Sequence, residues 1–196
     1  VGHAARVWEQ NCLALGAAAG FIEPLESTGI YVVEWMLKLF VDYVAPAGDS
    51  GACRGRVNRL AAEHHEELRD FIVAHYALSG RRDTPFWRAC TDAAALPPRL
   101  AELLALWDSK VPTPTDLDRR LSLFGAADWA FLLAGLQRLP SRGIGLADHI
   151  SAEVSLKAMA HVRGIREKAS QQSPTMRDYL RSLHSLRAPA ASEVAH

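Results

Sequence analysis

Apolar side chains recur every three or four residues along residues 56–77, and this repeat constrains the fold of the chain more than any other feature. The side chains that follow the repeat are Val57, Leu60, Ala61, His64, Leu68, Phe71, Ile72 and His75. Steps of three and four residues place side chains on one face of an α-helix, and most Glu and Arg residues of the segment fall elsewhere. The repeat predicts a long amphipathic helix that begins near Arg56 and ends near Ala77.

Helical spacing continues through most of the chain. Ser27 and Thr28 precede an apolar segment, residues 29–40, and either hydroxyl could serve as the N-cap of a helix there. Residues 6–15 stop at Gly16 and carry Val, Trp and Leu, so we predict one strand there. Further helices are predicted at residues 85–93, 98–108, 115–123, 126–139, 148–170 and 174–183. Residues 45–55 should break the helical pattern, and the fold is expected to be mainly α-helical.

The composition limits the classes of protein to which the chain can belong. Its 196 residues carry 22 basic and 22 acidic side chains, so the formal net charge is zero with His neutral. This balance argues against a nucleic-acid-binding protein with a broad cationic surface, and the 49% content of hydrophobic residues argues against disorder. The length suits one compact domain. The longest apolar run, residues 29–39, is interrupted by Glu34 and Lys38, so no membrane-spanning helix is predicted.

Metal-binding residue types occur without the spacing of a metal site. The three cysteines are Cys12, Cys53 and Cys90, an odd number at wide intervals that suits neither a disulfide framework nor zinc. We therefore predict no metal site and a location in the reducing cytoplasm. The run His64-His65-Glu66-Glu67 lacks the HExxH spacing of a zinc enzyme. His64 should lie on the apolar face while His65 and Glu66 turn away from it, which predicts a packed histidine beside a solvated acidic face.

The segment GFIEPLESTGIY, residues 20–31, concentrates the residues most suited to chemistry. Glu23 and Glu26 flank a proline-stiffened turn that leads directly into a predicted helix. A helix N-terminus offers unpaired N–H groups, so a halide or phosphate could bind the backbone of Thr28 and Gly29, where glycine leaves the backbone accessible. The alternative, which the spacing alone favours, is that Glu23 or Glu26 itself caps the helix.

Three blocks of sequence together resemble the flavin-dependent halogenases of the tryptophan halogenase type. The blocks are residues 11–16 with 20–31 (NCLALG and GFIEPLESTGIY), residues 68–76 (LRDFIVAHY) and residues 83–87 (DTPFW). The resemblance runs from about Trp8 to Leu183. It implies the C-terminal, mainly helical part of a two-part α/β enzyme similar to flavin monooxygenases. Residues 1–28 would end the FAD-binding domain with its last strand and the halide and flavin loop, residues 29–186 would form a helical substrate-side domain, and residues 187–196 would be a disordered tail.

The resemblance also implies a reaction. In that family, reduced FAD (FADH2), O2 and a halide give hypohalous acid, which travels through a tunnel to an organic substrate and is held there by a lysine of the N-terminal part. A glutamate assists the electrophilic step, and by position Glu26 corresponds to it. The implied activity is halogenation of an electron-rich, indole-like aromatic substrate with chloride or bromide, supported by a separate flavin reductase.

The resemblance assigns five neighbouring positions to the cofactor, the halide and the substrate side. The backbone of Thr28 and Gly29 corresponds to the halide site. Ala17 and Ile30 correspond to positions that contact FAD. Ser27 lies where the loop bridges the flavin and substrate sides, so that Glu26 and Ser27 together would face the substrate.

Departures from the family pattern limit what this chain should do alone. The nucleotide-binding glycine fingerprint and the catalytic lysine belong upstream, and the four lysines present, Lys38, Lys110, Lys157 and Lys168, lie outside any matching motif. The chain starts at Val1 without Met, so we expect a piece of a larger protein that lacks its FAD-binding half and is inactive by itself. Residues 119–129 lack the groups with which tryptophan-specific members of the family hold free tryptophan. This favours another electron-rich arene as the substrate, and Phe124 and Trp129 could line its pocket. The intact protein could also form a homodimer.

Two other functions stay open at the level of sequence. The first is a flavin-dependent monooxygenase relative that does not halogenate. The second is a non-catalytic helical fragment or binding module, which an exposed apolar face along residues 30–39 and around Leu13 and Leu15 would favour.

Overall fold

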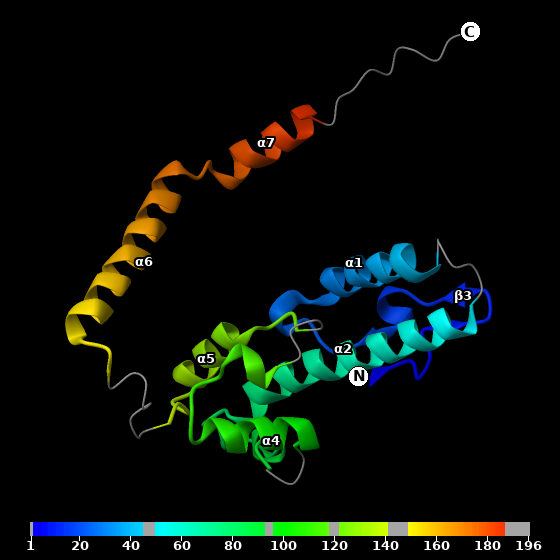
Figure 1. Ribbon diagram of the computed structural model, residues 1–196, viewed down its shortest axis with the longest axis horizontal. Coiled ribbons are helices and arrows are strands. Elements are labelled where there is room, and N and C mark those ends of the chain that lie inside the picture. The colour runs from blue at the N-terminus through cyan, green and yellow to red at the C-terminus, as the bar shows by residue number, and fades with distance from the viewer. Residues whose placement is uncertain (1, 45–49, 93–95, 118–121, 141–148, 187–196) are drawn as a thin grey trace. The chain divides into compact units, whose positions relative to one another are not determined.

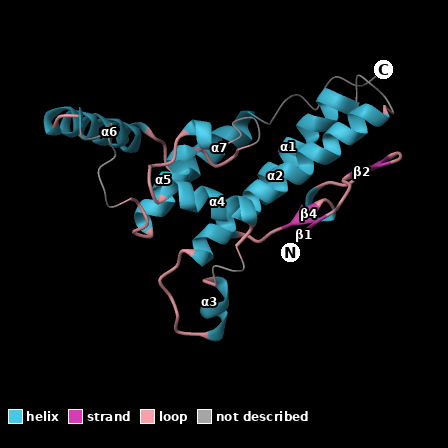
Figure 2. Ribbon diagram, turned by 60° about the horizontal axis from the view of Figure 1, so that its bottom comes forward, coloured by secondary structure: helices cyan, strands magenta, loops and turns pink. Residues whose placement is uncertain are grey.

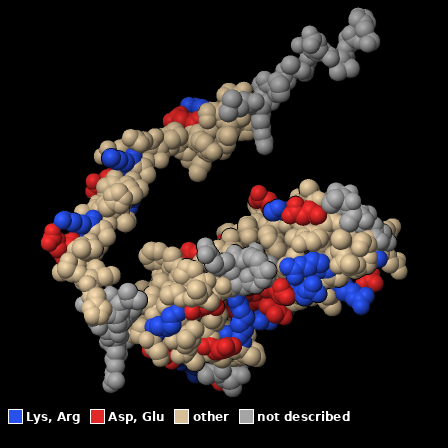
Figure 3. Space-filling model, viewed as in Figure 1, with Lys and Arg blue, Asp and Glu red and all other residues tan. Residues whose placement is uncertain are grey.

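The computed structural model describes residues 2–44, 50–92, 96–117, 122–140 and 149–186, and the chain divides into two compact units, residues 1–144 and 145–196 (Figure 1). Helices account for most of the described chain, and the few strands are short (Figure 2). Acidic and basic side chains are interspersed over the face shown in Figure 3. No helix within the described ranges has the length and apolar character needed to cross a membrane.

Two small antiparallel ladders form the N-terminal part of the first unit. β1 (Gly2–His3) pairs with β4 (Gly20–Phe21), and β2 (Trp8–Glu9) pairs with β3 (Cys12–Leu13). The single strand predicted for residues 6–15 is therefore wrong, because the chain reverses at Gln10, whose φ is 49°. Asn58 fixes the hairpin from outside: its side chain accepts from the N–H of Trp8 and donates to the carbonyl of Trp8. The periodicity of residues 6–15 carries no information about this contact with a residue of α2.

The two longest helices of the first unit lie side by side in both ribbon views (Figures 1 and 2). α1 (Gly29–Leu39) continues into the π-helical turn η3 (Phe40–Val44), and α2 spans Gly51–Ala77. Between them lies a core whose buried members include Val32, Met36, Val57, Leu60 and Leu68. The helix predicted for residues 56–77 is confirmed but begins earlier, since Cys53 packs against this core and Arg54 donates to the carbonyl of Gln10.

A second core surrounds the C-terminal half of α2. It is formed with α4 (Pro98–Trp107), α5 (Ala126–Gly135) and Leu117, which follows the 3-10 turn η5 (Pro114–Asp116). Its buried residues include Phe71, Leu100, Trp107, Trp129 and Leu133, so Trp129 is a core residue. The short helix α3 (Pro85–Cys90) has no buried residue. The helix predicted for residues 115–123 is wrong over its described part. A reciprocal cap between Thr113 and Asp116 closes one 3-10 turn, after which Leu117 is extended, while residues 118–121 lie outside the described ranges.

The second unit contains two described helices, α6 (Ala152–Gln172) and α7 (Met176–Leu186). They confirm the helices predicted at residues 148–170 and 174–183, and the observed boundaries differ from the predicted ones by a few residues. Their apolar side chains are solvent-exposed within the described chain, Val162 and Met176 among them. The predicted tail, residues 187–196, lies outside the described ranges.

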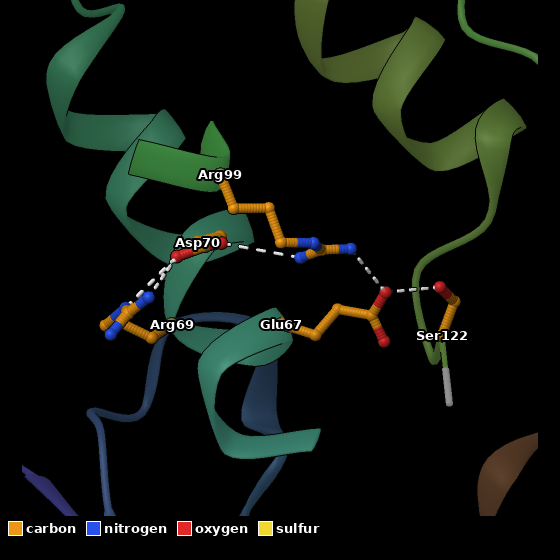
Figure 4. Close-up of polar contacts among 5 residues, drawn as sticks. All are labelled: Glu67, Arg69, Asp70, Arg99 and Ser122. Atoms are coloured by element: carbon orange, nitrogen blue, oxygen red, sulfur yellow. Dashed lines mark hydrogen bonds and ion pairs between the residues drawn. The ribbon is translucent and has the colours of Figure 1, made fainter. Parts of the chain in front are cut away.

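Two acidic side chains of α2, Glu67 and Asp70, are buried, which the sequence did not indicate, whereas Glu66 is exposed as expected. Arg99 of α4 donates to Glu67 at 3.1 Å and to Asp70 at 3.4 Å, and Ser122 donates to Glu67 from the loop before α5 (Figure 4). Arg69 adds a second donor to Asp70 at 2.8 Å. A buried carboxylate is tolerated only with such partners, so Glu67 and Asp70 connect this helix to its neighbours.

Candidate functional site

The loop between β4 and α1 adopts a backbone that most residues avoid. Glu26 has φ 66° and Ser27 has φ 54°, so two consecutive non-glycine residues lie in the left-handed region. Each such residue costs about 1–2 kcal/mol relative to the right-handed conformation. The turn around them is closed by a hydrogen bond from the N–H of Ser27 to the carbonyl of Pro24 at 2.9 Å. Contacts from the rest of the fold must therefore hold this loop in place.

Two consecutive residues near the end of α2 supply those contacts. His75 Nε2 lies 2.9 Å from Oε1 of Glu26, and the hydroxyl of Tyr76 donates to both carboxylate oxygens of Glu23 at 2.8 and 2.9 Å. The hydrogen bond to Glu23, with burial and the carboxylate charge, raises the pKa of Tyr76 above its ordinary value. Both glutamates of the loop are thus fixed to the same helix end.

The loop also forms one wall of an open pocket of about 540 Å³. Its lining includes all five positions predicted to contact cofactor or halide or to bridge toward substrate: Ala17, Ser27, Thr28, Gly29 and Ile30. Glu26 does not line this pocket, and its carboxylate lies against His75 instead. The structure brings the five positions together and directs the sixth, Glu26, to a different neighbour.

The start of α1 is not capped by a side chain. Thr28 occupies the N-cap position, but its backbone is helical rather than extended and its hydroxyl makes no capping hydrogen bond. The prediction of a hydroxyl cap is therefore wrong. Capping by Glu23 or Glu26 is not observed either, because those carboxylates accept from Tyr76 and pair with His75. A Cβ built on Gly29 would meet no atom within 4 Å, so the backbone there is accessible from the pocket.

His65 lies beneath the pocket, which the sequence did not indicate. It was expected to face away from the apolar side of its helix, yet it is 3% exposed and lines the pocket beside Gly20. Its Nδ1 is 2.8 Å from the carbonyl of Ala61, and burial lowers the pKa of its imidazole. A Cβ on Gly20 would come within 2.6 Å of His65 Nε2, so only glycine fits where this strand crosses the ring.

An aromatic group continues from Tyr76 onto α3. Tyr76 stacks on Trp87 with ring centroids 5.8 Å apart, and Phe86 meets Trp87 edge-on at 5.3 Å. The guanidinium of Arg81 lies 4.4 Å from the centroid of Trp87. Thr84 caps α3 by accepting from the N–H of Trp87, which fixes the start of the helix. Tyr76, Thr84, Phe86 and Trp87 fall in the last two of the three sequence blocks, and Tyr76 links this group to the loop through Glu23.

Comparison with known proteins gives a consistent result. The family model described as "Tryptophan halogenase" matches residues 1–152. The tryptophan 7-halogenase KtzQ of Kutzneria sp. (strain 744) is 31% identical over 94% of this chain, and the tryptophan 6-halogenase SttH of Streptomyces toxytricini is 31% identical over 81%. The chain spans only 37% of KtzQ and 31% of SttH.

Solved structures show the same relationship. Tar14, a tryptophan C-6 flavin-dependent halogenase from taromycin biosynthesis, superposes with a TM-score of 0.81 at 27% identity. That alignment covers 94% of this chain and 37% of Tar14. BrvH, a flavin-dependent halogenase from Brevundimonas sp. BAL3, gives a TM-score of 0.77 at 27% identity over 93% of this chain and 36% of BrvH. The described helices therefore resemble part of each structure, a little over a third of its length.

Proposed function

The chain belongs to the tryptophan halogenase family, and we propose that it forms the helical, substrate-side part of an enzyme that uses FADH2, O2 and chloride or bromide to halogenate an electron-rich aromatic substrate. The observation that carries the proposal is the arrangement of the loop before α1. The pocket beside this loop is lined by Ala17, Thr28, Gly29 and Ile30, while the carboxylate of Glu26 lies outside that pocket, against His75. A halogenase needs such a separation between the place where the oxidant forms and the base that serves the substrate.

The residues of the pocket suit a flat aromatic cofactor and a small anion. Ile30 is 85% exposed and Phe21 is 56% exposed, so the pocket mouth carries apolar surface that a flavin ring could cover. Alongside this surface, the uncapped start of α1 at Thr28 and Gly29 could donate backbone N–H groups to a halide. When bound, reduced flavin supplies the electrons that activate O2 and so permit oxidation of the halide. Ala17 and Ile30 would hold its ring, and Ser27 would connect that side to the substrate side.

Glu26 would act on the substrate as a base. In the electrophilic step, the ring carbon forms a bond to the halogen of hypohalous acid as the O–halogen bond breaks, and the oxygen leaves as hydroxide, which the proton later lost from the ring converts to water. The ring then loses its hydrogen: the C–H electrons return to the ring and the proton passes to the Glu26 carboxylate. The carboxylate is 35% exposed, so it is accessible to a substrate on its own side of the loop.

Exposed apolar surface supports the proposal that further chain covers α1. Ile30 is largely exposed and Leu37 is 46% exposed on this helix, whereas Leu13 and Leu15 are half-buried. A finished surface rarely leaves such side chains grouped on one helix. We propose that an FAD-binding half covers them, with residues 1–28 as its end and residues 29–186 as the substrate-side part. A separate flavin reductase, a homodimer and a cytoplasmic location stay predictions.

The test is activity of the intact protein with FADH2, O2, chloride or bromide, and a panel of indoles. We expect products that gain one halogen in place of hydrogen, identified by mass spectrometry. Glu26→Gln should slow halogenation about 100-fold or more, the range of a general base, without slowing FADH2 oxidation. Glu34→Gln, the same change at an exposed site of α1, serves as the control.

Three outcomes would count against the proposal. Halogenation by Glu26→Gln at the wild-type rate would remove the assigned role of the carboxylate. Products that gain oxygen instead of halogen would identify a monooxygenase. Absence of both products, with FADH2 oxidised no faster than without the protein, would favour a non-catalytic helical protein.

A further inference from the structure

The imidazole of His75 is hydrogen-bonded at both nitrogens. Nδ1 lies 2.9 Å from the carbonyl oxygen of Phe71, one helical turn earlier, and Nε2 lies 2.9 Å from Oε1 of Glu26. A carbonyl oxygen only accepts, so Nδ1 must carry a hydrogen. The contact between Nε2 and a carboxylate oxygen then requires one further proton between those two atoms. The arrangement therefore joins Glu26 to the imidazole through one hydrogen bond between Nε2 and Oε1.

Packing fixes the orientation of that ring. Phe71 meets His75 edge-on, with ring centroids 5.0 Å apart and an interplanar angle of 80°. Phe71 in turn stacks on Phe124 at 3.8 Å and meets the buried Trp129 edge-on at 4.8 Å. The direction of the Nε2–H group is thus set by the second core rather than by the loop that it contacts.

The contact with His75 involves only one of the two carboxylate oxygens of Glu26. His75 engages Oε1, so Oε2 is the oxygen available to a substrate. The backbone of Glu26 is in the left-handed region, which gives the carboxylate a direction that a relaxed loop would not keep. Tyr76, the next residue of α2, bonds Glu23 and not Glu26, so the two contacts have separable roles.

We infer that His75 is a positioning residue for Glu26: by its hydrogen bond from Nε2 to Oε1, it aims Oε2 at the substrate. The inference rests on the proposed role of Glu26 as the base. His75 itself does not contact the reacting atoms. During the reaction the proton passes from the ring carbon to Oε2, while the hydrogen bond between His75 and Oε1 persists.

Kinetics of three variants of the intact protein test the inference. His75→Leu removes the donor, whereas His75→Gln places an amide N–H near the position of Nε2 and restores it. We expect His75→Leu to lower kcat for halogenation about tenfold to a hundredfold, with KM for the arene changed by no more than about twofold and FADH2 oxidation unaffected. His75→Gln should recover most of the lost kcat. Tyr76→Phe, which removes the other contact between α2 and the loop, should lower kcat clearly less than His75→Leu does.

The outcomes separate this inference from the proposed function. If Glu26→Gln is slow but His75→Leu retains the wild-type kcat, the positioning role is wrong and the role of Glu26 stands. If Glu26→Gln is as fast as wild type, the role of Glu26 itself fails. If Tyr76→Phe matches the loss in His75→Leu, general tethering of the loop explains both, and the inference is overturned.

A spectroscopic measurement covers the case in which His75→Leu does not fold. Nitrogen-15 NMR of the imidazole, assigned by the signal lost in His75→Gln, reports which ring nitrogens carry a proton. We expect the Nε2 signal of His75 to shift between the wild-type protein and Glu26→Gln, because that nitrogen shares the hydrogen bond with Oε1, while the Nδ1 signal stays in place. An Nε2 signal at the same position in both proteins would contradict the inference without any activity assay.

Discussion

Asp116 provides a sharp test of how polar contacts stabilise the helical part of the molecule. Its carboxylate is 8% exposed and accepts hydrogen bonds from Lys110 Nζ at 2.6 Å, the Trp107 indole N–H at 3.0 Å and the backbone N–H of Thr113 at 2.8 Å. Trp107 is a buried member of the second core. Asp116→Asn keeps the size of the side chain and removes its charge, so it isolates the contribution of the ionised form.

The size of the effect follows from the pKa of this carboxyl group. Burial raises the pKa, but the hydrogen bonds from Lys110, Trp107 and Thr113 outweigh burial and lower it from 3.8 to about 2. A difference of that size corresponds to about 2.4 kcal/mol of unfolding free energy at neutral pH. Because the folded-state pKa is depressed, this stabilisation is fully present above pH 3.8 and is lost as the pH falls toward 2.

Urea unfolding at a series of pH values measures the prediction. At pH 7 we expect Asp116→Asn to lower the free energy of unfolding by about 2.4 kcal/mol, with the difference from wild type closing between pH 4 and pH 2. Asp108→Asn, the same change at an exposed carboxylate at the end of α4, should stay within about 0.5 kcal/mol. A loss in Asp116→Asn no larger than that of the control, or a difference independent of pH, would refute the reasoning.

Two further changes probe the candidate site through stability and titration. Glu23→Gln should bring the pKa of Tyr76 down toward its ordinary value of 10.0, because the carboxylate hydrogen bond is the main cause of its rise. If ultraviolet titration gave the same pKa for Tyr76 in this variant and in wild type, the contact would be contradicted. Gly20→Ala should destabilise the protein by about 1–3 kcal/mol in thermal unfolding, since the new Cβ would meet His65 Nε2 at 2.6 Å. Gly55→Ala, whose Cβ meets nothing within 4 Å inside α2, should be neutral or stabilising, and equal behaviour of the two alanine variants would rule out the close approach.

The helices were predictable wherever an apolar face repeats every three or four residues. α1, α2 and α4 follow that rule, because burying such a face is what stabilises a helix in a folded protein. The repeat could not locate the reversal at Gln10, which depends on Asn58 of α2. The repeat also could not distinguish a helix from the single capped turn at residues 114–116, where Asp116 accepts hydrogen bonds from Lys110 and Trp107.

The histidines show the same limit at the candidate site. The helical spacing predicted correctly that His64 lies on the apolar face, but it predicted wrongly that His65 points to solvent. The prediction took only one face of α2 to be covered. In the structure the β1–β4 ladder covers a second face, where Gly20 leaves room for the His65 ring. A helix packed on two sides buries more of its circumference than an amphipathic pattern can indicate.

The sequence by itself determined the helical class, the family and the loop that concentrates Glu23, Glu26, Thr28 and Gly29. Those properties are local, since they depend on spacing and on residue types within a dozen positions. Only the tertiary structure decided what each carboxylate contacts, because the partners lie at the far end of α2, with Tyr76 and Glu23 separated by 53 residues. The left-handed backbone of Glu26 explains why the partner matters: a loop that disfavours its own conformation keeps it only when distant side chains supply the compensating contacts.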